Sequence, residues 1–233
     1  MENQDFLAMM KSGEVLDHEL TPYLREDGLP ALRHPLVYQV PYTPVLAAWS
    51  NAMYRQKKER ITQLENEGNY SSILTLYERP YRVSALLKYA KRMAPSDYWK
   101  SVGWVWADTE NAAECWEEWA AVMADPRPER ESMMSPQERA ALEKMPEVME
   151  VWRGQTRGDP VTDFSWTLNK KTAKWFALRF NNRLGEILRG EVRKEAVLAY
   201  LTGRGEAEIM AWPTSVNILG SERIKLSAPK SDE

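Results

Sequence analysis

The stretch that decides the fold is residues 185–226, GEILRGEVRKEAVLAYLTGRGEAEIMAWPTSVNILGSERIKL. It contains four short runs rich in aliphatic side chains, at 186–192, 196–201, 208–212 and 222–226. Such runs predict short strands when turn residues divide them, and here the dividing residues are Gly185, Gly190, Gly203, Gly205 and Gly220. A fifth run lies at 148–152, so a strand-rich region is expected from about residue 146 onward.

Helical patterns dominate the chain before this region. Apolar side chains recur at helical spacing, and residues that start or stop helices flank them: Thr43, Pro44, Gly68 and the Ser135/Glu138 capping box. Helices are therefore predicted over 44–67, 82–93, 110–123 and 136–144. Residues 1–40 have no clear periodicity and contain Pro22, Pro30 and Pro35, so they are expected to form an irregular, partly packed arm.

A helical half followed by a strand-rich half predicts an α+β fold. One further helix is expected inside the strand-rich half, over 170–180. We expect a mainly helical region, 1–145, packed on a β-rich core, 146–226. Residues 227–233 are expected to be a disordered tail.

Composition excludes several kinds of site. Hydrophobic residues make up 43% of the 233 residues, enough for a sizeable core. Cys115 is the single cysteine and there are two histidines, so disulfides within the chain and metal sites are not expected. The sequence has no membrane-spanning apolar run and no secretory pattern at its start, which predicts a cytoplasmic protein without a membrane partner.

Charge is distributed unevenly along the chain. Residues 151–233 carry 14 Lys+Arg and 10 Asp+Glu, whereas residues 1–150 carry 17 and 24. Two interpretations remain open: ordinary surface variation, or an anionic ligand held by the basic C-terminal part. The net charge of −3 argues against a dedicated duplex-DNA binder.

The first motif that can carry chemistry is Trp152-Arg153-Gly154, at the end of a predicted strand. The arginine fork of donors matches a pair of phosphates, and a glycine beside it lets a flat ligand approach the backbone. Arg-Gly pairs also occur elsewhere in the chain, so a surface arginine before a turn is the alternative.

The second motif is Phe164-Ser165-Trp166-Thr167, with Asn169 as the expected N-cap of the 170–180 helix. In an extended segment the hydroxyls of Ser165 and Thr167 point to one face, where they can orient a carboxylate or a ribose. The alternative is the polar face of a half-buried strand.

The third motif is Glu206-Ala207-Glu208, which follows a glycine-rich turn and precedes an apolar run. On a strand, period-two geometry would put both carboxylates on one side. Glu-x-Glu also occurs at 65–67 and 129–131, but there in helical or loop contexts.

The order of these three motifs between residues 153 and 208 resembles the R-S-E class of mono-ADP-ribosyltransferases, including bacteriophage and bacterial members. The resemblance covers roughly residues 146–226 and implies a core of two small mixed or antiparallel sheets. It also implies that NAD⁺ is the co-substrate, that nicotinamide is released, and that no metal takes part. The motifs that carry it are Trp152-Arg153-Gly154, Phe164-Ser165-Trp166-Thr167-Leu168, Trp175-Phe176-Ala177 and Arg204-Gly205-Glu206-Ala207-Glu208.

The resemblance assigns catalytic roles to three side chains. Glu208 would stabilise the oxocarbenium-like transition state at the ribose and bind its 2′-hydroxyl. Glu206 would orient an acceptor guanidinium and take its proton, which implies an exposed arginine of a target protein as acceptor rather than a nucleic acid. Ser165 would hold Glu208 in place, with Thr167 beside it.

Binding roles follow from the same resemblance. Arg153 would hold the pyrophosphate and Gly154 the nicotinamide amide. Trp166 or Phe176 would line the nicotinamide pocket, although a core position is the alternative for each. The turn from Tyr200 to Gly205 would present the acceptor, with Arg204 offsetting the charge of the two glutamates.

Two other functions remain open beside arginine modification in the cytoplasm of a bacterial or phage-infected cell. An NAD⁺ glycohydrolase would use the same site with water as acceptor. An inert nucleotide- or partner-binding module would keep the fold without the reaction, with the helical region 1–145, whose role is unassigned, covering the core or recruiting a partner.

Overall fold

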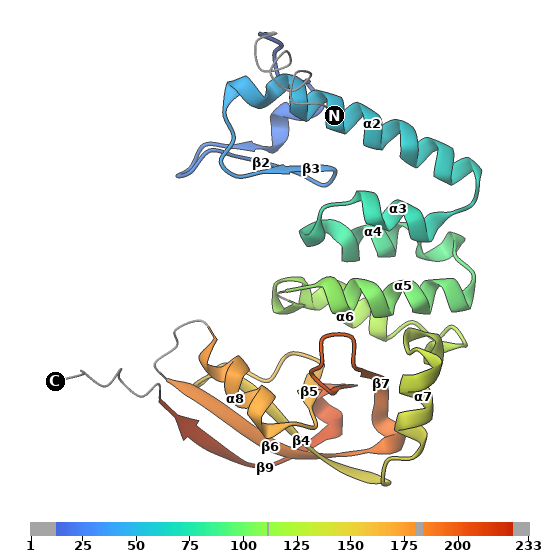
Figure 1. The fold of residues 1–233 in the computed structure, drawn as a ribbon, viewed down its shortest axis with the longest axis vertical. Coiled ribbons are helices and arrows are strands. Elements are labelled where there is room, and N and C mark those ends of the chain that lie inside the picture. The colour runs from blue at the N-terminus through green and yellow to red at the C-terminus, as the bar shows by residue number, and fades with distance from the viewer. Residues whose placement is uncertain (1–12, 111, 180–183, 226–233) are drawn as a thin grey trace, which may run out of the picture. The chain divides into compact units, whose positions relative to one another are not determined.

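A computed structural model describes residues 13–110, 112–179 and 184–225. The chain forms two compact units, Met1–Ala94 and Pro95–Glu233 (Figure 1). The mixed α+β class is confirmed, whereas the division differs from the predicted one at residue 146, because the helices of 95–143 belong to the unit that contains the large sheet. Among the described residues, none of the helices combines the length and apolar character needed to cross a bilayer.

The described residues of the N-terminal unit form a small antiparallel sheet followed by three α-helices. The sheet has the order β1-β2-β3. Its strands are β1 (Leu24–Arg25), β2 (Ala31–His34) and β3 (Val37–Gln39). The helices that follow are α2 (Ala47–Asn66), α3 (Tyr70–Leu76) and α4 (Arg82–Tyr89). Short 3₁₀ turns lie at Thr21–Tyr23, Pro44–Leu46, Arg79–Tyr81 and Ala90–Arg92.

The irregular structure predicted for residues 1–40 is wrong for the described part, which contains β1, β2 and β3, whereas the predicted partial packing of this segment is confirmed. Leu32 and Val37 are buried on β2 and β3, and they pack with Tyr42 and Tyr54 in one hydrophobic cluster. These strands are too short for an alternating pattern to stand out in the sequence, which explains the difference. The predicted stop of the following helix at Gly68 is confirmed by its positive φ of 68°.

The C-terminal unit begins with three helices, α5 (Pro95–Asp108), α6 (Trp116–Met123) and α7 (Pro136–Glu143), with 3₁₀ turns at Ala112–Cys115 and Arg130–Met133. Helix α5 was not predicted. Gly103 interrupts its pattern, and the structure explains this glycine: a Cβ there would lie 2.4 Å from the carbonyl oxygen of Met133. The capping box that starts α7 is confirmed, since Ser135 and Glu138 bond each other's backbone amides.

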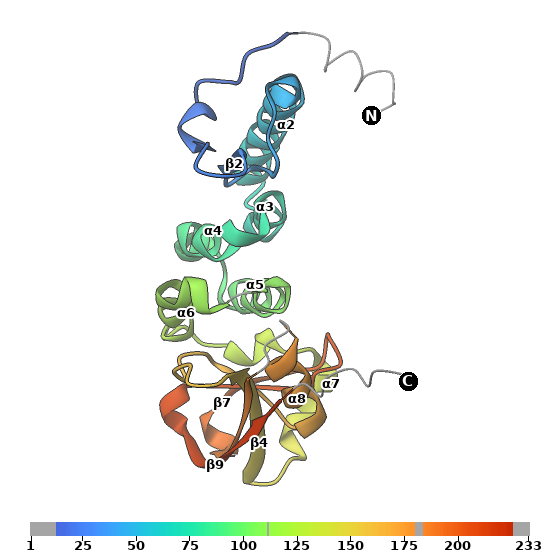
Figure 2. The same cartoon turned by 90° about the vertical axis from the view of Figure 1, so that its left-hand side faces the viewer.

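One six-stranded antiparallel sheet follows, in the order β7-β8-β5-β4-β6-β9. Three of its strands, β4, β7 and β9, are labelled in Figure 2. Among the described residues of this unit, hydrogen bonds thus join the strands into a single sheet rather than the two small sheets expected. The strands are β4 (Val148–Thr156), β5 (Ser165–Thr167), β6 (Gly185–Arg193), β7 (Val197–Leu201), β8 (Glu208–Ala211) and β9 (Val216–Ile224). Two further 3₁₀ turns are Lys194–Ala196 and Pro213–Ser215.

Helix α8 (Lys170–Leu178) lies against β4 and β6 (Figure 1). Two glycines allow this close approach. A Cβ at Gly154 would lie 1.8 Å from the carbonyl oxygen of Ala173, and one at Gly185 would lie 2.6 Å from that of Ala177. The helix backbone therefore rests directly on the sheet.

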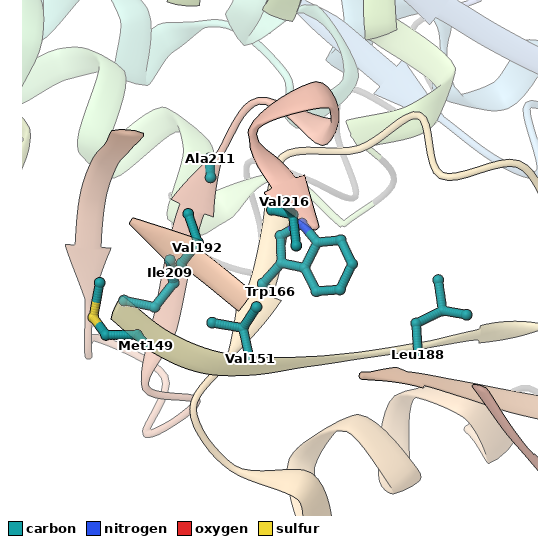
Figure 3. Packing of buried hydrophobic residues seen from close by; sticks show 8 residues of the cluster. All are labelled: Met149, Val151, Trp166, Leu188, Val192, Ile209, Ala211 and Val216. Atoms are coloured by element: carbon teal, nitrogen blue, oxygen red, sulfur yellow. The ribbon is translucent and has the colours of Figure 1, made fainter. Parts of the chain in front are cut away.

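A hydrophobic cluster fills part of the core beside β4, β5 and β8 (Figure 3). The Trp166 ring packs there with Val151, Ile209 and Val216. Because side chains alternate along a strand, the burial of Trp166 turns its neighbours Ser165 and Thr167 to the other side of β5. The core thereby positions the two hydroxyls predicted to be functional.

Candidate active site

Three adjacent strands bring the predicted residues together. Strand β5 pairs with β4 on one side and with β8 on the other, with Thr167 opposite Glu208. Arg153 from β4, Ser165 from β5 and Glu208 from β8 all line one cavity of about 230 Å³. Side chains scattered over 56 positions of sequence therefore share one site.

Glu208 lies at the centre of the hydrogen bonding in this cavity. Its side chain is almost buried, with 5% exposed. Ser165 Oγ donates to Glu208 Oε1 over 2.5 Å, and Trp106 Nε1 donates to the same oxygen over 3.0 Å. Burial raises the pKa of Glu208 above its ordinary value, and these two hydrogen bonds oppose the rise.

Thr167 connects the site to both of its flanking segments. Its Oγ1 donates to the backbone oxygen of Glu206 over 2.5 Å and accepts from the backbone N–H of Asn169 over 3.0 Å. Asn169 in turn caps α8, since its Oδ1 accepts from the backbone N–H of Lys171. Thr167 therefore ties β5 to the turn before β8 and to the start of α8.

Glu206 lines the cavity, but the prediction that it lies on a strand with Glu208 is wrong. Strand β8 begins at Glu208, and Ala207 has a positive φ of 47°, which few non-glycine residues adopt. Glu206 belongs to the preceding turn, where Arg204 Nε lies 3.6 Å from Glu206 Oε2. Period-two geometry thus does not set the relation of the two carboxylates.

Arg153 uses its guanidinium inside the protein. It donates to the backbone oxygen of Ser165 over 2.9 Å and to Asp163 Oδ2 and Gln155 Oε1, each over 3.3 Å. Only 15% of the Arg153 side chain and 18% of the Asp163 side chain are exposed. The Asp163 carboxylate is thus a largely buried negative charge beside the Arg153 guanidinium, which is predicted to bind phosphate.

The two predicted aromatic residues differ in their positions. Trp166 borders the cavity, but its side chain is 1% exposed and its ring belongs to the hydrophobic cluster of Figure 3. Phe176 lines the cavity from α8, and the Arg179 guanidinium lies over its ring, 5.0 Å from the centroid. A flat ligand would therefore meet Phe176, while Trp166 has the core position.

Gly154 and Tyr200 also differ from their predicted roles. The Cβ position of Gly154 faces the α8 backbone, so close packing alone accounts for this glycine, although it borders the cavity. Tyr200 lies within β7, before the turn, and its backbone N–H donates to Met134 Sδ over 3.2 Å. It is not among the described residues that line the cavity.

Two further residues of the site, Trp106 and Asp163, were not predicted from the sequence. Asp163 is two residues before Ser165, and its Oδ1 accepts from the Ser165 backbone N–H over 3.3 Å, so this short spacing was an available signal. Trp106 lies in the unpredicted helix α5, more than a hundred positions from Glu208, and no local pattern links the two.

The arrangement can bind and polarise a ligand without a metal ligand set. No group of three or more His, Cys, Asp or Glu side chains suited to a metal ion occurs in the part of the chain that the structure describes. Arg153, Arg179 and Arg204 offer positive charge at the cavity wall, and Glu110, Asp159, Asp163, Glu206 and Glu208 offer negative charge. Carboxylates at such a wall can stabilise positive charge that develops on a bound ligand.

Comparisons of this chain with family models, with curated proteins and with solved structures find no match. The case for a function therefore depends on the geometry of the site.

Proposed function

We propose that this protein is an NAD⁺-dependent mono-ADP-ribosyltransferase that modifies an arginine side chain of a target protein and releases nicotinamide. The observation that carries the proposal is the convergence of Arg153, Ser165 and Glu208 on one cavity, with Ser165 donating directly to Glu208. The single free thiol, Cys115, suits the cytoplasm as the place of this reaction.

Glu208 would act on the bond between ribose and nicotinamide. As this bond breaks, its electron pair leaves with nicotinamide and positive charge develops on the ribose carbon. An ionised carboxylate held in a cavity that is partly shielded from water stabilises that charge more than water does. Ser165 supports this role by fixing the carboxylate, so Glu208 has no need to reorient during the reaction.

Arg153 would bind the pyrophosphate, whose oxygens match its fork of donors. The cavity of about 230 Å³ is smaller than the roughly 300–1,000 Å³ of whole ligand pockets, so it suits the nicotinamide and ribose half of the dinucleotide. The remaining half would extend over Arg153 towards solvent.

Glu206 would orient the acceptor. Its carboxylate forms an ion pair with the guanidinium of Arg204, 3.6 Å from Nε to Oε2, and this pair supports a role for Glu206 in holding a guanidinium group. An arginine of a target would replace Arg204, its terminal nitrogen would form the bond to the ribose carbon, and the released proton would go to Glu206.

The same ion pair supports NAD⁺ hydrolysis as the second candidate. While Arg204 occupies Glu206, a foreign arginine is excluded and water becomes the acceptor. The two functions differ in their product: hydrolysis gives free ADP-ribose, whereas transfer gives modified protein.

Incubation with NAD⁺ labelled in the adenylate part, with and without a bacterial lysate, tests the proposal. We expect nicotinamide release together with label on a lysate protein, and loss of both in Glu208→Gln. Label found only in free ADP-ribose would select the hydrolase. If well-folded protein neither consumes NAD⁺ nor gains thermal stability from it at millimolar concentration, the inert binding module is favoured.

A further inference from the structure

Trp106 is the least expected partner of Glu208. It lies in the last turn of α5, outside the three motifs, and its Nε1–H donates to Glu208 Oε1 over 3.0 Å. Only 3% of Trp106 is exposed, and it also lines the cavity. A hydrogen bond from a buried donor to a buried carboxylate is costly to remove, because neither group then finds water as a substitute partner.

An aromatic cluster fixes the indole in place. The Trp106 ring meets Trp119 edge to face, with centroids 4.9 Å apart, and meets Phe164 at 6.0 Å. Phe164 directly precedes Ser165, and Trp116 stacks on it at 4.8 Å. The packing that orients the indole thus also orients the backbone that carries the other donor to Glu208.

Both donors address the same carboxylate oxygen. Ser165 and Trp106 bond Oε1, and none of the residues that the structure describes donates to Oε2. Two bonds on one oxygen determine how the carboxylate is rotated about its last torsion. Oε2 is then the oxygen left for a ligand.

We propose that Trp106 is a positioning residue, which together with Ser165 locks Glu208 so that Oε2 meets the ribose. As a positioning role in catalysis, this rests on the proposed NAD⁺ reaction; the hydrogen bond itself does not. The indole also favours the ionised carboxylate, since it donates to it. It thereby opposes the rise that burial causes in the pKa of Glu208.

Trp106→Phe tests the role, because it removes the N–H and keeps an aromatic ring in the cluster. Tyr98→Phe is the matched control: Tyr98 lies on the same helix outside the cavity lining, it is fully buried, and its hydroxyl has no partner among the described residues. We expect Trp106→Phe to lower kcat for nicotinamide release by about 10- to 100-fold with little change in KM. The acid limb of the pH–rate profile of Trp106→Phe should move to higher pH, because the pKa of Glu208 rises when the donor is lost. Tyr98→Phe should change neither kcat nor the pH profile.

The charged groups around Glu208 are the same in both variants, so the comparison isolates the indole N–H. The charges of Arg204 and Glu206, in the turn before β8, act on the pKa of Glu208. The same cavity is lined by Glu110 after α5, Arg153 on β4, Asp159 after β4, Asp163 before β5 and Arg179 after α8. Equal pH profiles and equal kcat in the two variants would overturn the proposal.

A measurement on the unmutated indole covers the case in which Trp106→Phe fails to fold. The ¹⁵N–¹H signal of the Trp106 side chain, assigned by triple-resonance NMR, should shift with pH as Glu208 ionises. The shift should vanish in Glu208→Gln. An indole signal that does not titrate, or that titrates equally in Glu208→Gln, would contradict the bond.

The kinetic comparison and the NMR titration distinguish the proposed reaction from the positioning role of Trp106. A wild-type protein that releases no nicotinamide refutes the proposed reaction and the catalytic role of Trp106, whereas the NMR titration decides the hydrogen bond on its own. Nicotinamide release with no coupling between Trp106 and Glu208 would refute the positioning role and leave the proposed reaction standing.

Discussion

Ser165 Oγ donates a hydrogen bond of 2.5 Å to Glu208 Oε1, although 43 positions separate the two residues in sequence. The bond forms because β5 and β8 are neighbours and because the burial of Trp166 turns Ser165 away from the core. A hydroxyl beside a buried carboxylate stabilises the ionised form, which the proposed chemistry requires.

The stability of the protein should depend on pH through Glu208. Its pKa is raised in the folded state by burial, from an ordinary value of 4.5. Between that value and the folded pKa, the native state binds more protons than the unfolded state, so this group's contribution to stability is lost as pH rises. Glu208→Gln should therefore match the wild type in acid and become the more stable protein towards neutral pH.

Urea unfolding at a series of pH values measures this difference. Glu222→Gln provides a control of opposite sign, because the Lys170 partner lowers the pKa of Glu222. That carboxylate is exposed, so its effect should be small and should favour the wild type as pH rises. Parallel stability curves for Glu208→Gln and the wild type would contradict the burial argument.

Gly154→Ala should destabilise the fold by about 3 kcal/mol, because the new Cβ would meet the carbonyl oxygen of Ala173, which belongs to a helix backbone and has little freedom to move. Gly220→Ala on β9 is the matched control, since a Cβ there has no neighbour within 4 Å. Thermal or urea unfolding of both variants checks this. Equal stability of the two would show that Gly154 is not required for the packing of α8.

Asp163→Asn should strengthen NAD⁺ binding. The Asp163 carboxylate competes with an incoming phosphate for Arg153, and it would repel that phosphate. Asparagine keeps the acceptor for the Ser165 backbone N–H and removes the charge. We expect KM for NAD⁺ to fall by about 3- to 10-fold with kcat little changed, measured by steady-state nicotinamide release.

An unchanged or higher KM in Asp163→Asn would mean that Asp163 orients Arg153 for binding rather than competing with the ligand. Arg153→Lys should raise KM in either case, because an ammonium group lacks the planar fork of donors.

Glu206→Gln should separate the two candidate reactions. The amide cannot form an ion pair with a guanidinium or take its proton, so labelling of target protein should be lost while nicotinamide release persists. Arg204→Ala should increase the labelling of target protein relative to free ADP-ribose, because it removes the guanidinium that already forms an ion pair with Glu206. Chromatography of free ADP-ribose beside autoradiography of protein resolves the products; equal loss of both in Glu206→Gln would refute its acceptor role.

The sequence was most informative where a local pattern had one physical meaning. The capping box at Ser135 and the helix after Asn169 are present, and a strand overlaps each of the five predicted runs. Gly185 and Gly190 lie inside β6 and Gly220 lies inside β9, so the prediction that these glycines divide strands is wrong. The alternation along β5 also gave the common orientation of Ser165 and Thr167, because a large indole between two hydroxyls has only one side to be buried on.

Other features depend on contacts between distant segments, and no local pattern encodes them. The Trp106–Glu208 bond needs the packing of α5 near β8, and the close packing of Gly154 against α8 needs the helix in place. Glu206 was assigned to a strand because its pattern alternates, but Ala207 has a positive φ and β8 begins only at Glu208, so Glu206 lies before the strand. Tertiary structure decided these positions.

Nicotinamide release from NAD⁺ by wild type, Ser165→Ala and Glu208→Gln is the most direct test of whether this cavity cleaves a dinucleotide at its ribose. We predict steady release by the wild type, about 10- to 100-fold slower release by Ser165→Ala, and none above background by Glu208→Gln. Equal rates in all three proteins, or no release by a folded wild type, would contradict the proposed reaction.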